Sequence, residues 1–206
     1  MTRQRYLDFN ATAPSRPEVI EAVADAMREG GNASSVHGTG RFARGGVEQA
    51  RRSVAALVSA DPANVIFTGS GTEANNQALR ASGRKRLIVT AIEHASVLQA
   101  RPEAIVCPVL SCGIVDLEAL RRILMASNEP ALIAVMAANN ETGILQPIAE
   151  VARLAEEHGA LLHCDAVQAA GKIPVDMAVL GTDFIALSAH KIGGPQGVGA
   201  LICRDR

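Results

Sequence analysis

The stretch "FIALSAHKIGGPQGVGALICR", residues 184–204, contains two apolar runs separated by a glycine-rich turn. The runs cover residues 184–189 and 199–204, and about nine residues lie between them. A parallel crossover needs a dozen or more residues, usually including a helix. These two strands are therefore expected to pair antiparallel. Lys191, one of only three lysines in the chain, stands just after the first of them.

The chain before this stretch alternates apolar runs with helical patterns. Apolar runs that predict strands cover residues 65–69, 86–92, 104–109, 131–139 and 161–167. Apolar residues at near-helical spacing predict helices over residues 16–29, 40–59, 72–82, 117–127 and 148–158. Together these patterns predict an α/β fold. Its seven-stranded sheet is mostly parallel with one antiparallel strand, and helices cover both faces.

The composition argues against several classes of partner. Basic and acidic residues number 20 and 21, and aromatic residues make up 2%, so nucleic acid is not an expected partner. The sequence has no signal peptide and no apolar run long enough for a membrane span. We therefore expect a soluble protein of a reducing compartment, the cytoplasm.

The four cysteines lack the spacing of a zinc or redox site, so no metal site is expected. Cys107, Cys164 and Cys203 lie in apolar runs and are expected to be buried, with unreactive thiols. Cys112 lies in a loop and is expected to be exposed.

Polar residues follow five of the predicted strands. In open α/β sheets, ligands bind beyond the carboxyl ends of the strands, so these residues mark the expected site. They fall in the segments 68–73, 93–94, 139–142, 165–168 and 188–191.

The first segment carries the glycine pattern Gly69-x-Gly71-x-x-Ala74, with Glu93 about twenty residues further on. This spacing also occurs in NAD-binding domains, and an NAD site is therefore one alternative. More generally, the glycines allow close backbone approach, and the following helix offers free N–H groups to a phosphate. A plain glycine turn before a helix capped by Thr72 is the other alternative.

Asp165 and Lys191 together indicate which kind of ligand this edge of the sheet binds. A buried carboxylate at the end of a strand needs a cation or several donors, although Asp165 could also simply cap the next helix. A partly desolvated lysine has a depressed pKa and attacks carbonyls to form a Schiff base. A phosphate, an aldehyde and a protonated pyridine nitrogen together describe pyridoxal 5′-phosphate. An NAD site leaves Lys191 and Asp165 without a role. Lys85 and Lys172 are interpreted as surface lysines.

With these residues assembled, the chain resembles the cysteine desulfurases, in the class V aminotransferase group of fold-type I pyridoxal-phosphate enzymes. The resemblance runs essentially from end to end. Its blocks are "YLDFNATAP", "GNASSVHGTGRFARGGVEQAR", "VIFTGSGTEANN", "IEHASV", "GIVDLEAL", "NNETGILQPI", "HCDAVQAAGKIPVD" and "SAHKIGGPQGVGAL".

The resemblance implies a role for each matching residue. Lys191 would carry the cofactor as a Schiff base and shuttle the substrate Cα proton, and Asp165 would pair with the pyridine nitrogen. His94 would stack on the ring as a catalytic residue. The remaining cofactor contacts would come from Gly71, Thr72, Ser188 and His190 at the phosphate, and from Gln168 and Asn140 at the ring hydroxyl. Asn140 would also lie near the substrate carboxylate.

In this family L-cysteine is converted to alanine, and an enzyme cysteine receives the sulfur as a persulfide for iron–sulfur clusters and other acceptors. The resemblance implies an N-terminal arm over residues 1–15 and a cofactor-binding large domain over residues 16–206. The family's persulfide cysteine, its carboxylate-binding arginine and its small domain lie beyond Arg206. Residues 1–206 alone are therefore expected to be inactive in desulfuration.

A homodimer, or a partner chain that carries the small domain, is expected. Alternatives that remain are a catalytically silent cofactor-binding or dimerisation module, a selenocysteine lyase and another class V aminotransferase.

Overall fold

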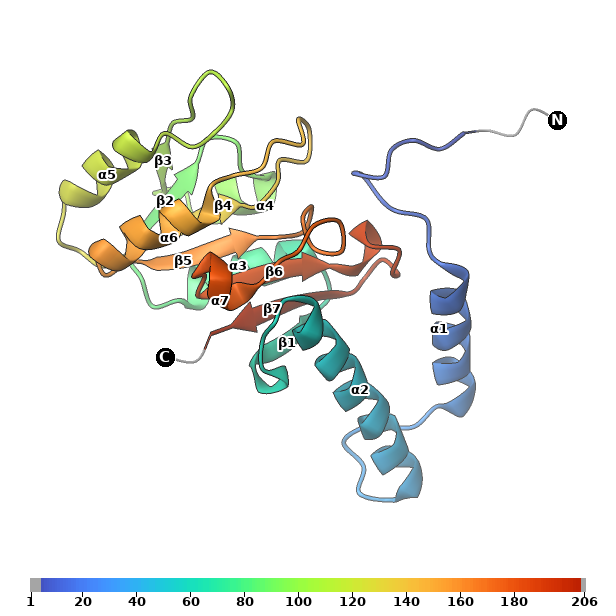
Figure 1. Cartoon of the computed structure of the whole chain (residues 1–206). Coiled ribbons are helices and arrows are strands. Elements are labelled where there is room, and N and C mark those ends of the chain that lie inside the picture. The colour runs from blue at the N-terminus through green and yellow to red at the C-terminus, as the bar shows by residue number, and fades with distance from the viewer. Residues whose placement is uncertain (1–4, 205–206) are drawn as a thin grey trace.

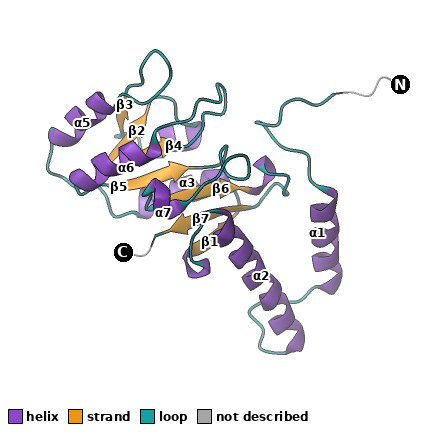
Figure 2. Cartoon of the chain, in the orientation of Figure 1, coloured by secondary structure: helices purple, strands orange, loops and turns teal. Residues whose placement is uncertain are grey.

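A computed structural model describes residues 5–204, and Figures 1 and 2 show its α/β architecture. Seven strands form one sheet in the order β1-β7-β6-β5-β4-β2-β3. The strands are β1 (Val65–Thr68), β2 (Arg86–Thr90), β3 (Ile105–Cys107), β4 (Ala131–Met136), β5 (Leu161–Asp165), β6 (Phe184–Ser188) and β7 (Gly199–Cys203). The predicted fold class is confirmed.

Strand β7 is the antiparallel strand. It pairs antiparallel with β6, with Ser188 opposite Gly199, and antiparallel with β1 on its other side. The remaining pairs in the sheet, from β6 to β3, are parallel. Gly199 is required by a close approach, because a Cβ there would lie 2.5 Å from the backbone carbon of Ser70. The prediction made from the short connection between residues 189 and 199 is confirmed.

Helices cover both faces of the sheet, as expected. The helices are α1 (Pro17–Glu29), α2 (Gly38–Leu57), α3 (Gly71–Ala81), α4 (Ala95–Leu98), α5 (Leu117–Met125), α6 (Ile148–Glu157) and α7 (Met177–Leu180). Neighbouring residues of β4 pack on opposite faces of the sheet. Ile133 packs in the core under α5 and α6. Leu132 packs with Leu79 of α3 and Val97 of α4. In Figure 1, α6 and α3 accordingly lie on opposite faces.

Helices α1 and α2 extend away from this body (Figure 1). No residue of α1 is buried, although the helix is amphipathic. Its side chains Ile20 and Met27 are 58% and 79% exposed, and Phe42 of α2 is 61% exposed. Apolar surface of this kind on one pair of helices marks a contact surface for another part of a protein or a partner.

The strands end earlier than the apolar runs predicted, because the last residues of each run turn into the loops at the rim of the sheet. One burial prediction is wrong: Cys203 is only partly buried, since it is the last residue of β7, where the strand leaves the core. Cys107 and Cys164 are buried and Cys112 is exposed, as expected. Among the described residues, no helix combines the length and hydrophobicity that a membrane crossing requires.

Candidate functional site

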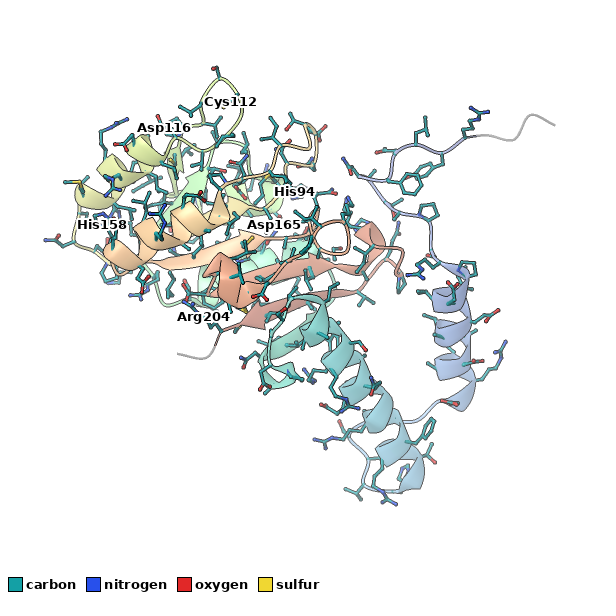
Figure 3. The ribbon with its side chains drawn as sticks, viewed as in Figure 1. His94, Cys112, Asp116, His158, Asp165 and Arg204 are labelled. Atoms are coloured by element: carbon teal, nitrogen blue, oxygen red, sulfur yellow. The ribbon has the colours of Figure 1, made fainter. Side chains whose placement is uncertain are left out.

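A cavity of about 440 Å³ opens at the carboxyl ends of the parallel strands. It gathers residues from the five polar segments and from the N-terminal arm. Its walls include all nine site residues predicted from the sequence: Gly71, Thr72, His94, Asn140, Asp165, Gln168, Ser188, His190 and Lys191. Figure 3 shows His94 and Asp165 at this end of the sheet. The sequence thus predicted the position of the cavity.

Helix α3 points its N-terminus into the cavity. Ser70 caps it by accepting a hydrogen bond from the backbone N–H of Glu73, so the cap is Ser70 and not Thr72. Gly71 has no room for a side chain, because a Cβ would lie 2.8 Å from Cγ2 of Val167 and 3.2 Å from Cβ of Ser188. A bare glycine and the free N–H groups of the first helical turn suit a phosphate or another anion.

Glu93 does not face this cavity. It is 5% exposed, and its Oε1 accepts hydrogen bonds from Thr90 and from the backbone N–H of Met136. Burial raises the pKa of Glu93 to about 8, so the side chain is mostly protonated at neutral pH. Glu93 is therefore a buried structural residue here, and the NAD alternative loses the carboxylate on which it depended.

Asp165 ends β5 with its carboxylate at the floor of the cavity. The residue is 5% exposed; Oδ1 accepts a hydrogen bond from the backbone N–H of Val167 and Oδ2 accepts one from Asn75 at 2.7 Å. Burial raises the pKa of Asp165, while these two hydrogen bonds oppose the rise. A cation bound beside Asp165 would stabilise its charged form.

Lys191 follows β6 on a short 3-10 turn, Ala189–Lys191, and reaches the N-terminal arm. Its Nζ donates to the backbone oxygens of Asn10 at 2.6 Å and Ala11 at 2.8 Å. Partial burial lowers the pKa of Lys191, and the positive charge of Lys172 lowers it further. A lysine with a depressed pKa is a competent nucleophile toward a carbonyl group.

His94 lies at the cavity with a defined tautomer. Its Nδ1 accepts a hydrogen bond from the backbone N–H of Ser96 at 3.1 Å and contacts Ser96 Oγ at 2.8 Å. Because a backbone N–H can only donate, Nδ1 carries no proton, and the proton of the neutral ring is on Nε2. On the other side of the cavity, Nδ1 of His190 contacts Oγ1 of Thr12 at 3.2 Å.

Gln168 and Asn140 also contact the N-terminal arm. Gln168 donates to the backbone oxygen of Asn10, and Asn10 donates to the backbone oxygen of Asn140. Lys172 donates to Oε1 of Gln168 at 2.7 Å, which leaves the Gln168 amide nitrogen as the group that faces the arm and the cavity.

Three residues in or beside this site were not predicted from the sequence. Asn75 is 1% exposed on α3, but a polar residue in a helix usually marks a solvated face, and nothing in its spacing indicated burial. Lys172 is exposed, as interpreted, yet it also contacts the site residue Gln168. Asn10 comes from 158 residues earlier than Gln168, and no local pattern predicts so distant a contact.

The chain is similar in sequence to a known protein family. Residues 5–206 match the family described as aminotransferase class-V. The chain belongs to this family.

Relatives within the aminotransferase class-V family are named as desulfurases. The chain is 40% identical over 216 residues to an IscS-like cysteine desulfurase of Mycobacterium tuberculosis, covering 97% of this chain and 55% of that protein. It is 41% identical over 219 residues to a mitochondrial cysteine desulfurase of Arabidopsis thaliana, covering 99% of this chain and 48% of that protein. The chain thus spans about half the length of the curated relatives it matches.

Solved structures of similar proteins share the fold. A NifS-like protein from Rickettsia africae superposes with a TM-score of 0.91 at 38% identity, covering 98% of this chain and 58% of that one. SspA, solved in complex with cysteine, superposes with a TM-score of 0.89 at 29% identity, covering 98% and 62% of the two chains.

The thiols of this class-V aminotransferase chain lie apart from the cavity. Burial raises the pKa of Cys107 to about 11 and raises that of Cys164 as well. Figure 3 shows Cys112 on a loop far from His94 and Asp165. In the part of the chain that the structure describes, no group of three or more His, Cys, Asp or Glu side chains is arranged to hold a metal ion.

Proposed function

We propose that this chain is the cofactor-binding large domain, with its N-terminal arm, of a pyridoxal-phosphate-dependent cysteine desulfurase. The observation that carries the proposal is the cavity that combines the Lys191 amine, the buried Asp165 carboxylate and the bare N-terminus of α3. Identity of about 40% to cysteine desulfurases over nearly the whole chain supports the same function.

The residues present fit pyridoxal 5′-phosphate. Asp165 is a buried carboxylate whose charge needs a cationic partner, and a protonated pyridine nitrogen is one. The first turn of α3, which begins at Gly71, offers free backbone N–H groups to a phosphate, which Thr72, Ser188 and His190 would also contact. Lys191 is an amine with a lowered pKa, suited to bind the aldehyde. The cofactor supplies an electron sink for the substrate Cα.

The residues of the site would then orient the cofactor and the substrate and would move protons. The Nζ of Lys191, once released from the cofactor, would take the proton from the substrate Cα. His94 would stack on the cofactor ring and present its Nε2–H to the substrate. The Gln168 amide nitrogen would donate to the ring hydroxyl, and Asn140 would contact that hydroxyl and the substrate carboxylate.

We propose L-cysteine as the substrate, because the curated relatives are named for it and SspA was solved with cysteine. Desulfuration requires a thiolate that attacks the sulfur of the substrate. The S–S bond of a persulfide would form as the C–S bond of the substrate breaks, the electron pair would stay with the carbon, and protonation of that carbon would give alanine. Cys107 and Cys164 do not suit this step, since their pKa values are raised by burial. The acceptor thiol, the carboxylate-binding arginine and the small domain would come from outside residues 1–206.

A homodimer and a sulfur-acceptor protein are the proposed partners, and the exposed apolar faces of α1 and α2 offer contact surface. The cytoplasm, a reducing compartment, is the proposed location because Cys107, Cys112 and Cys164 are free thiols.

The test is alanine formation from L-cysteine by the full-length protein loaded with pyridoxal phosphate. We expect Lys191→Ala to abolish it, since no other amine of the chain lines the cavity among the described residues. Lys85→Ala, at an exposed lysine outside the cavity, is the matched control and should keep full activity. Cys112→Ser should also remain active. Alanine formation by the Lys191→Ala protein would contradict the proposal.

A further inference from the structure

His163 lies beneath the candidate site and does not line its cavity. It sits in the middle of β5, two residues before Asp165, and is 0% exposed. Its side chain has one hydrogen-bond partner among the described residues: Nε2 lies 2.8 Å from Oδ1 of Asn75, while Nδ1 is buried without a partner. Nothing proposed so far for this site involves His163.

The protonation state of His163 follows from its surroundings. Burial lowers the pKa of His163 to about 3, so the ring is neutral at physiological pH and carries one proton. The proton must be on Nε2, because the partner atom, an amide oxygen, can only accept.

This Nε2–H stabilises the orientation of the Asn75 amide in which Oδ1 faces His163 and Nδ2 faces Asp165. With Oδ1 held by His163, the two hydrogens of Nδ2 point to Oδ2 of Asp165 at 2.7 Å and to Oγ of Ser96 at 3.0 Å. The flipped amide would place two acceptor oxygens against each other at Asp165 and would turn its NH₂ toward His163.

The second hydrogen of Asn75 extends the chain of bonds to His94. Ser96 Oγ accepts from Asn75, so its own proton is free to be donated to Nδ1 of His94 at 2.8 Å. The hydrogen bonds thus run from His163 through Asn75 and Ser96 to His94, and each donor in this chain of bonds points toward the cavity. A leucine at position 163 would avoid an unpartnered nitrogen in the core, so the bond made by Nε2 is what explains a histidine there.

We infer that His163 is a positioning residue that acts through Asn75 to hold the Asp165 carboxylate in place as an acceptor for a ring nitrogen. The inference rests on the proposed cofactor. It predicts that the loss of the Nε2–H lets the Asn75 amide turn and weakens the interaction of Asp165 with a protonated nitrogen, while the phosphate and aldehyde contacts remain.

The experiment compares two ligands of the full-length apoprotein: pyridoxal phosphate and 1-deazapyridoxal phosphate, in which C–H replaces the ring nitrogen. Wild type should prefer pyridoxal phosphate. In His163→Leu that preference should fall by about five- to tenfold, as expected for one buried hydrogen bond, with affinity for the deaza compound unchanged. His163→Gln, which places an amide N–H near the position of Nε2, should restore the preference.

A matched control is Leu161→Ala, on the same strand, buried and without a polar group. This variant should bind both ligands more weakly by the same factor, or bind both as tightly as wild type. If His163→Leu does not fold, His163→Met serves in its place with the same expected result. In wild type, ¹⁵N-histidine spectra should show His163 as the neutral Nε2–H tautomer between about pH 5 and 8.

An Nδ1–H tautomer for His163, or an undiminished preference for pyridoxal phosphate in His163→Leu or His163→Met, would overturn the inference. A wild type that binds neither compound would instead contradict the proposed function itself, because the inference concerns only the difference between the two ligands.

Discussion

At the scale of single residues, two lysine amino groups converge on Asn10. Lys191 donates to its backbone oxygen and Lys172 to its side-chain oxygen at 3.2 Å. Because like charges disfavour each other, Lys172 adds to burial in lowering the pKa of Lys191. An exposed lysine thus increases the fraction of the Lys191 amine that is neutral and able to attack a carbonyl.

The change Lys172→Met should therefore raise the pKa of Lys191. At neutral pH less of the amine would be neutral, so pyridoxal phosphate should react several-fold more slowly, and the pH midpoint of the reaction should move upward. Stopped-flow absorbance of the apoprotein mixed with cofactor across a pH series measures both. Lys85→Met is the control and should behave as wild type. An unmoved midpoint in Lys172→Met would contradict this account of the site.

At the scale of secondary-structure elements, the N-terminus of α3 meets the ends of β5 and β6 at Gly71. A methyl group at Gly71 would overlap Val167 and press on Ser188. Gly45 in α2 provides a matched position, since an added Cβ there meets nothing within 4 Å.

Gly71→Ala should destabilise the protein by about 1–3 kcal/mol, the usual cost of overpacking, and should weaken binding of pyridoxal phosphate. Gly45→Ala should be neutral or stabilising by up to about 1 kcal/mol, since alanine favours a helix. Urea unfolding and cofactor titration give the two quantities. Equal stability and equal affinity of the two variants would show that the close packing at Gly71 has no consequence.

The elements were predictable because their patterns are local. Runs such as residues 131–139 and 184–189 are apolar enough to be strands covered on both faces, and the nine-residue connection after residue 189 required an antiparallel pair. The predicted ends of the strands were less accurate, because Ala137 and Ala189 extend apolar runs although they lie beyond the ends of β4 and β6. The position of β7 between β1 and β6 depends on pairing across the whole chain, which no local pattern contains.

The site was predictable to a similar degree. Residues that follow strands could be assigned to one edge of the sheet, and all nine predicted residues line the cavity. The supporting residues could not be assigned in this way. Asn75 and His163 meet across 88 residues of sequence, and each of them alone resembles an ordinary helix or strand residue.

At the scale of the whole molecule, the sheet body holds the cavity while α1 and α2 extend from it with apolar side chains exposed (Figure 1). The N-terminal arm connects the two parts: the backbone N–H of Ala13 donates to the backbone oxygen of His190, and that of Arg16 to the oxygen of Gly193. The arm therefore lies against the same turn that carries Lys191, and residues from both segments, 8–11 and 188–191, line the cavity.

The proposed function depends most on which amine binds the cofactor. The direct measurement is borohydride reduction of the pyridoxal-phosphate-loaded protein, followed by peptide mass spectrometry. Lys172 is the competing amine, since it lies beside the cavity and burial lowers its pKa as well. We predict that the reduced cofactor is attached to the peptide that contains Lys191. Attachment to Lys172 or Lys85 instead, with Lys191 unmodified, would contradict the proposed role of Lys191.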